Sequence, residues 1–120
     1  MDSNTNISQL KEKIKEFCEE RDWDQYHNAK DLAIGIITES SELLEHFRFK
    51  SEKQVEELFN SPDNKEKISE EVADIFYFLL RLAQKYEIDL SSELSKKISK
   101  NEKKYSIEKS KGSNKKYNEL

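Results

Sequence analysis

Apolar residues recur every three or four positions along most of this chain, which is the period of an amphipathic helix. The first apolar stripe consists of Ile7, Leu10, Ile14 and Phe17. It predicts a helix from about residue 8 to residue 20, which Asn6 or Ser8 can cap. Residues 21–30 are aromatic and polar but have no sustained period. We interpret them as an ordered loop whose aromatic side chains either cover the core or line a pocket for a flat ligand.

Three further helices follow from the same period. Asp31 can cap a second helix, which extends to Phe47. A shorter helix is predicted for residues 52–59, and the Asn-Ser-Pro-Asp-Asn sequence behind it breaks the chain. A fourth helix then runs from about residue 63 to residue 86. Its middle, residues 75–80, is apolar nearly all round, as expected of a central buried helix.

The end of the chain differs in charge from the rest. Asp89 or Ser91 can cap a fifth helix that ends near Tyr105, and residues 106–120 are predicted to form a flexible, lysine-rich tail. Residues 96–117 contain nine lysines and two glutamates, a net charge of +7, whereas the remainder carries −11. The acidic body argues against broad nucleic-acid binding, and the basic segment suits an anionic ligand that carries a divalent cation.

Composition supports an all-α fold. The chain has 120 residues, 34% of them hydrophobic and 38% charged, with only two glycines and one proline, too few turn residues for a many-stranded fold. We expect an antiparallel bundle of four to five helices, with one domain at residues 1–105 and the tail at 106–120. Because a chain of this length encloses little, we expect oligomerisation to complete the fold.

The sequence also bears on location. The lone Cys18 has no partner for an intramolecular disulfide, and its acidic neighbours disfavour a reactive thiolate. No apolar run reaches membrane-spanning length, and no signal-peptide pattern is present. We therefore expect a cytoplasmic protein without a membrane partner.

Two pairs of acidic residues interrupt the apolar stripes of the second and fourth helices. Glu39 has apolar neighbours one turn before and one turn after it, and so does Glu71. Residues three apart lie on one face of a helix, so Glu42 and Asp74 point the same way as these two. Since an unpaired buried carboxylate is costly, four converging carboxylates need a cation.

The donor set indicates which cation. His27 and His46 are the only histidines and lie far apart in the sequence, so no zinc cluster is predicted, and no acid of the two pairs has the histidine at plus three that di-iron bundles need. Oxygen ligands alone favour Mg²⁺, with Mn²⁺ as a second candidate. The competing interpretation is a buried ion pair that fixes helix register, with Arg81 or Lys67 as its cation.

A second polar stripe lies on the fifth helix. Lys97, Asn101 and Tyr105 stand at successive i, i+4 positions, so a cation, an amide and a phenol project in one row. A nucleotide that carries a pyrophosphate group fits this combination. The metal and the lysines would address its phosphates, and the aromatic residues its base.

Four segments stand in the order and separation found in one known family. They are Phe17-Cys18-Glu19-Glu20-Arg21-Asp22-Trp23-Asp24-Gln25-Tyr26-His27, Glu39-x-x-Glu42-Leu43, Glu71-x-x-Asp74 and Lys97-x-x-x-Asn101-x-x-x-Tyr105. Through them the sequence resembles the all-α, MazG-like nucleoside triphosphate pyrophosphohydrolases, and it is most similar to the dCTP pyrophosphatase branch. The resemblance covers about residues 17 to 105.

The resemblance implies a role for each matching residue. The metal ligands would be the four acids Glu39, Glu42, Glu71 and Asp74, and one of them or Glu45 would orient or deprotonate the attacking water. The reaction would release pyrophosphate and a nucleoside monophosphate. Phosphates would be contacted by lysines and a phenol, and the base by aromatic rings and an amide. These implied substrate-binding residues are Trp23, His27, Lys30, Phe47, Phe49, Phe78, Lys97, Asn101 and Tyr105.

The chain departs from the family pattern around the base site. After the acidic pair Glu39 and Glu42 the chain has Phe47-Arg48-Phe49, where the dCTP-type enzymes have a sequence similar to Phe-Gln-Trp. The stacking surface is therefore smaller and more basic. The proline expected after His27 is absent, with Asn28 and Ala29 in its place. Phe78 stands where some relatives have tyrosine, and Ser106 replaces a proline after Tyr105. None of these changes touches the four implied metal ligands.

The resemblance and the residue pattern together predict Mg²⁺-dependent hydrolysis of dCTP or a modified pyrimidine nucleotide, a house-cleaning activity on nucleotide pools, by a homodimer or homotetramer. The alternative is a non-catalytic helical interaction protein whose basic tail binds nucleic acid. The preferred base and sugar, the number of metal ions and the identity of the general base stay open at this point.

Overall fold

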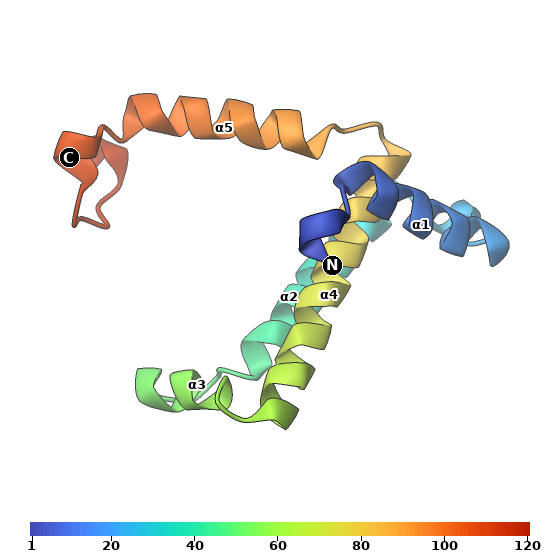
Figure 1. Ribbon diagram of the computed structural model, residues 1–120, viewed down its shortest axis with the longest axis horizontal. Coiled ribbons are helices and arrows are strands. Elements are labelled where there is room, and N and C mark those ends of the chain that lie inside the picture. The colour runs from blue at the N-terminus through green and yellow to red at the C-terminus, as the bar shows by residue number, and fades with distance from the viewer. The chain divides into compact units, whose positions relative to one another are not determined.

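The computed structural model describes residues 1–120 as an all-α protein with six α-helices and no strand (Figure 1). The predicted all-α class is confirmed, and the chain divides into two compact units, residues 1–87 and 88–120. The first unit contains α1 (Ile7–Glu20), α2 (Ala29–Glu45), α3 (Glu52–Leu58), α4 (Pro62–Lys85) and the short 3-10 helices Asp2–Asn4 and Asp24–Tyr26. The second contains α5 (Leu90–Lys104), α6 (Ile107–Ser110) and the 3-10 helix Tyr117–Glu119.

Each α-helix begins where a short polar side chain satisfies a free backbone N–H group of its first turn. These capping residues, in chain order, are Asn6, Asn28, Ser51, Ser61, Asp89 and Ser106. In α1 the cap is reciprocal, because Gln9 bonds the backbone N–H of Asn6 in return. The sequence therefore specifies helix starts locally.

The second helix begins three residues earlier than predicted, nearly one turn, and ends two residues earlier. The side chain of Asn28, and not that of Asp31, accepts the capping bond, and it also donates to the Asp31 carboxylate at 2.8 Å. The helix consequently starts at Ala29. It ends at Glu45, so Phe47 lies in the turn that follows.

The core of the first unit lies where α4 packs on α1 and α2, and α2 and α4 are antiparallel (Figure 1). A close approach of α2 and α4 occurs at Gly35, where a methyl group would lie 2.6 Å from the Phe78 ring. Glycine is required there because the ring occupies the space of a side chain. The fully or nearly buried apolar residues are Cys18, Leu32, Ile68, Leu80 and Ala83.

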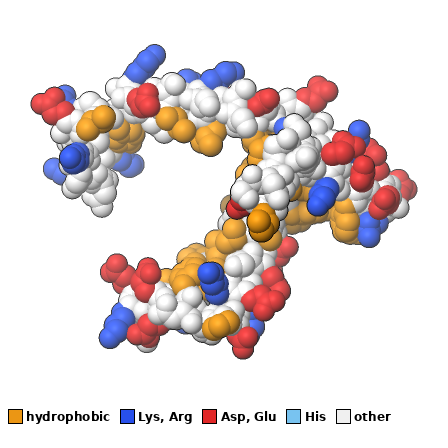
Figure 2. Space-filling view, in the orientation of Figure 1, with side chains coloured by type: hydrophobic (Ala, Val, Ile, Leu, Met, Phe, Trp, Pro, Cys, Tyr) orange, Lys and Arg blue, Asp and Glu red, His pale blue; other side chains and the backbone are white.

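One side of α4 is not covered by the first unit, so the prediction of a helix buried all round is wrong in part. Leu80 is 2% exposed, whereas Val72, Phe76 and Leu79 are each about two-fifths to one-half exposed. With Leu43 these side chains line an apolar groove. Figure 2 shows hydrophobic side chains reaching the surface of both units. The period of the sequence identifies apolar faces, but not whether a neighbour covers them.

The second unit has no buried apolar residue on α5, where Leu94 and Ile98 are exposed. The segment predicted as a tail contains α6 and a 3-10 turn. Its Tyr117 packs edge-on against Tyr105, with ring centroids 6.1 Å apart, and Lys104 lies over the Tyr117 ring. Throughout the chain, no helix combines the length and apolar character that crossing a membrane requires.

Candidate functional site

Three carboxylates converge between α2 and α4. Glu39 and Glu42 lie one turn apart on α2, and the antiparallel packing of α4 places Glu71 opposite them. One oxygen from each of these three side chains lies within 4.8 Å of the other two. The predicted convergence of the two acidic turns is thus present for three of the four acids.

The buried oxygens of this cluster lack partners. Oε2 of Glu39 and Oε2 of Glu71 are inaccessible to solvent and accept no hydrogen bond. Leaving such an acceptor unsatisfied costs about 1–3 kcal/mol, more when it is charged. Burial raises the pKa of Glu39 above its ordinary value, and so do a hydrogen bond shared with Glu42 and the negative charges of Glu42, Asp74 and Glu71. A bound cation would remove both penalties.

The neighbourhood of the cluster differs from the prediction in two respects. Asp74 is exposed and is not one of the three closely spaced acids, although its charge acts on Glu39. His46, for which the sequence predicted no role in this site, has its Nε2 atom 3.5 Å from Oε1 of Glu71. His46 follows α2 directly, so the turn after this helix returns it toward α4, a placement that spacing alone does not give.

The competing interpretation assigned a cation of α4 to the buried acids. Arg81 is buried and does form an ion pair, but with Asp24 of the loop before α2. Lys67 is exposed. A set of carboxylate oxygens without a bound arginine suits a hard divalent cation such as Mg²⁺, which prefers oxygen ligands and keeps several waters. Glu39, Glu42 and Glu71 could hold such a cation, and Asp74 lies close enough for its negative charge to act on Glu39.

The residues after the first acidic turn occupy the surface. Glu45 is largely exposed and pairs with Arg48 at 3.2 Å. Phe47 stacks on Phe59 with ring centroids 6.0 Å apart. Phe49 is 91% exposed, has a positive φ of 62°, and lies beneath the Arg48 guanidinium. Of these residues, Phe49 has the ring that is free to meet a ligand.

The aromatic loop is ordered, as predicted. Trp23 packs edge-on against Phe17 at 5.6 Å and against His27 at 6.3 Å, so one ring joins α1 to the loop. Trp23 is still 39% exposed. Lys30 is exposed in the first turn of α2, and Phe78 lies against Gly35 and Tyr77 in the core.

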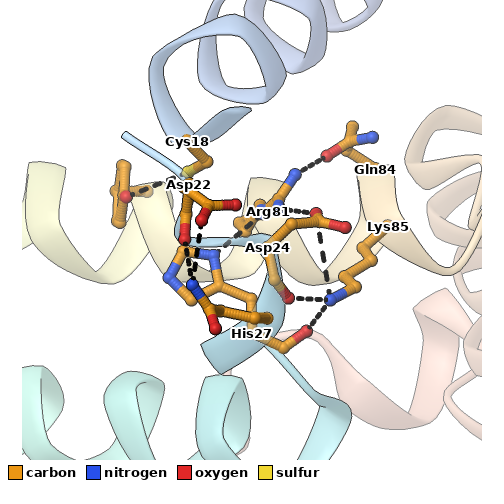
Figure 3. Close-up of polar contacts among 9 residues, drawn as sticks. Cys18, Asp22, Asp24, His27, Arg81, Gln84 and Lys85 are labelled. Carbon is orange, nitrogen blue, oxygen red and sulfur yellow. Dashed lines mark hydrogen bonds and ion pairs between the residues drawn. The ribbon is translucent and has the colours of Figure 1, made fainter. Parts of the chain in front are cut away.

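A polar network fixes the same loop to α4 (Figure 3). Arg81 donates from Nε to Nδ1 of His27 at 3.0 Å and from another nitrogen to Asp24. Lys85, one turn further on, donates to the backbone carbonyls of Asp24 and His27. Arg81 was predicted as the cation of a buried ion pair, but with the acids of α2 and α4; its actual partners, Asp24 and His27, were not predicted.

In the second unit, Lys97 and Asn101 stand one turn apart on α5. Tyr105 is the C-cap residue, outside helical geometry, and its backbone N–H bonds the Asn101 carbonyl at 2.8 Å. The predicted row therefore holds for the first two residues. Lys97 shares a basic surface with three other lysines of the same helix, Lys96, Lys100 and Lys103.

Comparison with known proteins gives the geometry a context. The model of the MazG-like family matches residues 34–120, which include both acidic turns and α5. The chain belongs to the MazG-like family. This confirms the resemblance stated from the sequence.

Individual relatives agree with this family membership. The chain is 30% identical to dCTP pyrophosphatase 1 of Bos taurus over 118 residues, which covers 98% of this chain and 70% of that protein. It is 32% identical to the Rattus norvegicus protein of the same name, with 88% and 62% covered. A crystal structure of a pyrophosphatase from Archaeoglobus fulgidus superimposes with a TM-score of 0.79 at 34% identity, covering 86% of this chain and 94% of that one. This MazG-like chain is a nucleoside triphosphate pyrophosphatase by class.

Proposed function

We propose that this MazG-like protein hydrolyses dCTP or a modified pyrimidine nucleoside triphosphate to the monophosphate and pyrophosphate, with Mg²⁺ as its metal. The observation that carries the proposal is the group of Glu39, Glu42 and Glu71 oxygens within 4.8 Å of one another, two of the residues having a buried oxygen without a partner. Relatives named dCTP pyrophosphatase 1 support the choice of substrate.

The acids of α2 and α4 have distinct tasks in this proposal. Glu39, Glu42 and Glu71 hold Mg²⁺, for which Mn²⁺ can substitute, and Asp74 is the fourth ligand. When bound, the divalent ion supplies positive charge to the phosphate oxygens and makes water a better nucleophile. An acid of the cluster, or Glu45, orients or deprotonates the attacking water. Because the carboxylates are preset by helix packing, little reorganisation accompanies the reaction.

Recognition of the nucleotide rests on the family resemblance and on accessible rings. Trp23 and Phe49 are the exposed aromatic residues of the predicted base site, and His27 borders Trp23. In the second unit, Lys97 and Tyr105 are assigned to phosphates and Asn101 to the base edge, because an amide offers a paired donor and acceptor. Lys30, Phe47 and Phe78 complete the proposed substrate residues, with Phe47 and Phe78 acting through the rings they pack against.

A homodimer or homotetramer fits the surface of the first unit. Ile37 is 69% exposed and Leu44 62%, on the same helix pair as the apolar groove of Val72 and Phe76. Covering such a surface with a second copy would remove apolar area from water. Sedimentation of the purified protein measures this directly. A monomer at all concentrations would contradict this part of the proposal.

The test of the activity is a panel of ribo- and deoxynucleoside triphosphates, including methylated cytosine nucleotides, assayed for pyrophosphate release. We expect dCTP or a modified pyrimidine to be preferred, with Mg²⁺ required, Mn²⁺ as a substitute, and activity lost in chelator. Preference for a purine nucleotide would contradict the proposed pyrimidine substrate. Release of pyrophosphate from none of them would contradict the reaction and favour the non-catalytic alternative, which predicts salt-sensitive binding to nucleic acid instead.

A further inference from the structure

Arg81 is the one charged side chain that the fold buries almost completely. It is 1% exposed and is also the largest side chain buried to that degree. A guanidinium in such a place has to find an acceptor for its donors, because an unpaired buried charge is strongly destabilising. Figure 3 shows that it does so with the loop that precedes α2.

The partners of Arg81 can be assigned nitrogen by nitrogen. Nε donates to Nδ1 of His27 at 3.0 Å, one terminal nitrogen donates to Oε1 of Gln84 at 2.5 Å, and the other donates to the carboxylate of Asp24. Arginine is a donor only and stays protonated in proteins. The direction of the bond to His27 is therefore fixed, and Nδ1 of His27 has to offer its lone pair.

This direction decides the protonation of His27. A neutral imidazole that accepts at Nδ1 carries its proton on Nε2, and a doubly protonated ring would set an N–H against the Arg81 donor. Burial lowers the pKa of His27, as do the charges of Arg81 and Lys85 on α4, while Asp24 of the loop opposes them. His27 thus stays neutral, with one defined tautomer.

Lys85 prevents the loop from adjusting around this bond. Its Nζ donates to the backbone carbonyl of Asp24 at 2.7 Å and to the carbonyl of His27. Asp24, which begins the 3-10 turn Asp24–Tyr26, and His27, which caps its C-terminal end, are consequently both bonded to the C-terminal half of α4. Trp23, whose ring is predicted to contact the base, is the N-cap residue of the same turn.

We propose that Arg81 is a positioning residue that fixes His27 in the Nε2–H tautomer, so that the loop offers a hydrogen-bond donor to the base of the nucleotide. The inference rests on the proposed function, which places His27 in the base-contacting loop. Arg81 itself touches no substrate. A fixed donor selects a base edge that carries an acceptor, such as the carbonyl oxygen or unprotonated ring nitrogen of cytosine, and disfavours an edge that presents an amino group.

The first arm of the test is nitrogen NMR of the histidine rings in the full-length protein. The chain has two histidines, so a His27→Gln variant assigns both signals. We expect the His27 ring to be a neutral Nε2–H tautomer at neutral pH and to protonate only at a lower pH than an ordinary histidine. An Nδ1–H tautomer in the wild-type protein, or a His27 that protonates at or above its ordinary pKa, would overturn the proposal without any need for a variant.

The second arm uses two matched substitutions on neighbouring turns of α4. Arg81→Met removes the donor to Nδ1, and we expect mixed tautomers and a KM raised by about tenfold with a smaller change in kcat. Lys85→Met leaves the Arg81 bond in place and should keep the tautomer. If Arg81→Met does not fold, Asp24→Asn replaces it: it retains the Arg81 donor, so the tautomer should persist while protonation moves to still lower pH. The role of Arg81 would be contradicted if Lys85→Met or Asp24→Asn, which both keep Arg81, lost the Nε2–H tautomer of His27. It would also be contradicted if Arg81→Met kept that tautomer alone.

The two arms separate this inference from the function on which it rests. Absence of pyrophosphate release with an intact Nε2–H tautomer would reject the proposed function and the recognition of the base, but would confirm the action of Arg81 on His27. Normal pyrophosphate release by a protein whose His27 has the other tautomer would reject the inference alone. An unchanged KM in Arg81→Met with mixed tautomers would reject donation to the base.

Discussion

Two polar clusters lie on α4, and they differ in whether their members satisfy one another. Near the middle of the helix, Glu71 meets two acids of α2, and buried oxygens of Glu39 and Glu71 have no partner. Nearer its C-terminal end, Arg81 is more deeply buried, yet its three donor groups each have an acceptor. One cluster is incomplete within the protein, and the other is complete.

The difference shows how a ligand site can be told from a structural network. Buried polar groups are normally paired, so a pair of unsatisfied carboxylates in helices that pack closely calls for something that the chain does not supply. An arginine whose donor groups all have acceptors within the chain needs no ligand, and it fixes the positions of the residues to which it is hydrogen-bonded. Four predictions test this contrast, beginning with the one expected to have the greatest effect.

Glu71→Gln should reduce pyrophosphate release by at least about 100-fold, because it removes a ligand from the proposed metal site. The metal-free variant should also melt at a higher temperature than the wild type, since the repulsion among the three acids falls. Steady-state kinetics and thermal unfolding in chelator measure the two effects.

Glu70→Gln is the matched control for that experiment, because Glu70 is the exposed neighbour of Glu71 on the same helix. It should leave both rate and melting temperature unchanged. An active Glu71→Gln enzyme would remove the acid cluster from the mechanism.

Asp24→Ala should destabilise the fold by about 2–3 kcal/mol, because the buried Arg81 loses its only anionic partner. Urea unfolding measures the change. Glu20→Ala, which breaks an exposed pair with Arg21 at 3.6 Å, should cost less than about 0.5 kcal/mol. Adding Arg81→Met to Asp24→Ala should recover part of the loss, and equal costs for the two single acid substitutions would contradict the contrast between buried and exposed pairs.

Gly35→Ala should destabilise the protein by about 1–3 kcal/mol, although alanine usually favours a helix over glycine. The reason is the Phe78 ring, 2.6 Å from where the methyl group would lie. Separation of α2 and α4 should also weaken Mg²⁺ binding at Glu39 and Glu71, which calorimetry can detect. A second substitution, Phe78→Leu, should restore stability, and a stabilised Gly35→Ala protein would show that the helices are not in close contact there.

The smallest effect concerns pH. His27 has a pKa below its ordinary value of 6.5, so the folded state binds fewer protons than the unfolded state between the two values. Stability should therefore fall as the pH drops below about 6.5 and should level off below the folded pKa. Urea unfolding from pH 7.5 to 5 measures this slope. His27→Gln should flatten the histidine contribution, and a steeper slope in the variant would contradict the assigned direction.

Particular residues show what the sequence could predict. Glu39 and Glu71 stood out because each interrupts an apolar stripe, and helical period carries that information over a single turn. The Arg81 network could not be found in this way, because Asp24 and Arg81 are separated by 57 residues and by a loop without a period. The early start of α2 was not predicted, because Asn28 and not the predicted Asp31 caps the helix, and the loop before it has no period.

The sequence by itself determined the all-α class, the order of the main helices and the faces on which the acids lie, because period and caps act over a few residues. Tertiary structure decided which acids meet, that His46 approaches Glu71, that Arg81 binds the aromatic loop, and that one side of α4 stays uncovered. The physical reason is that these outcomes depend on the register between packed helices and on the path of the loops. Those features follow from the balance of burial and polar pairing over the whole chain.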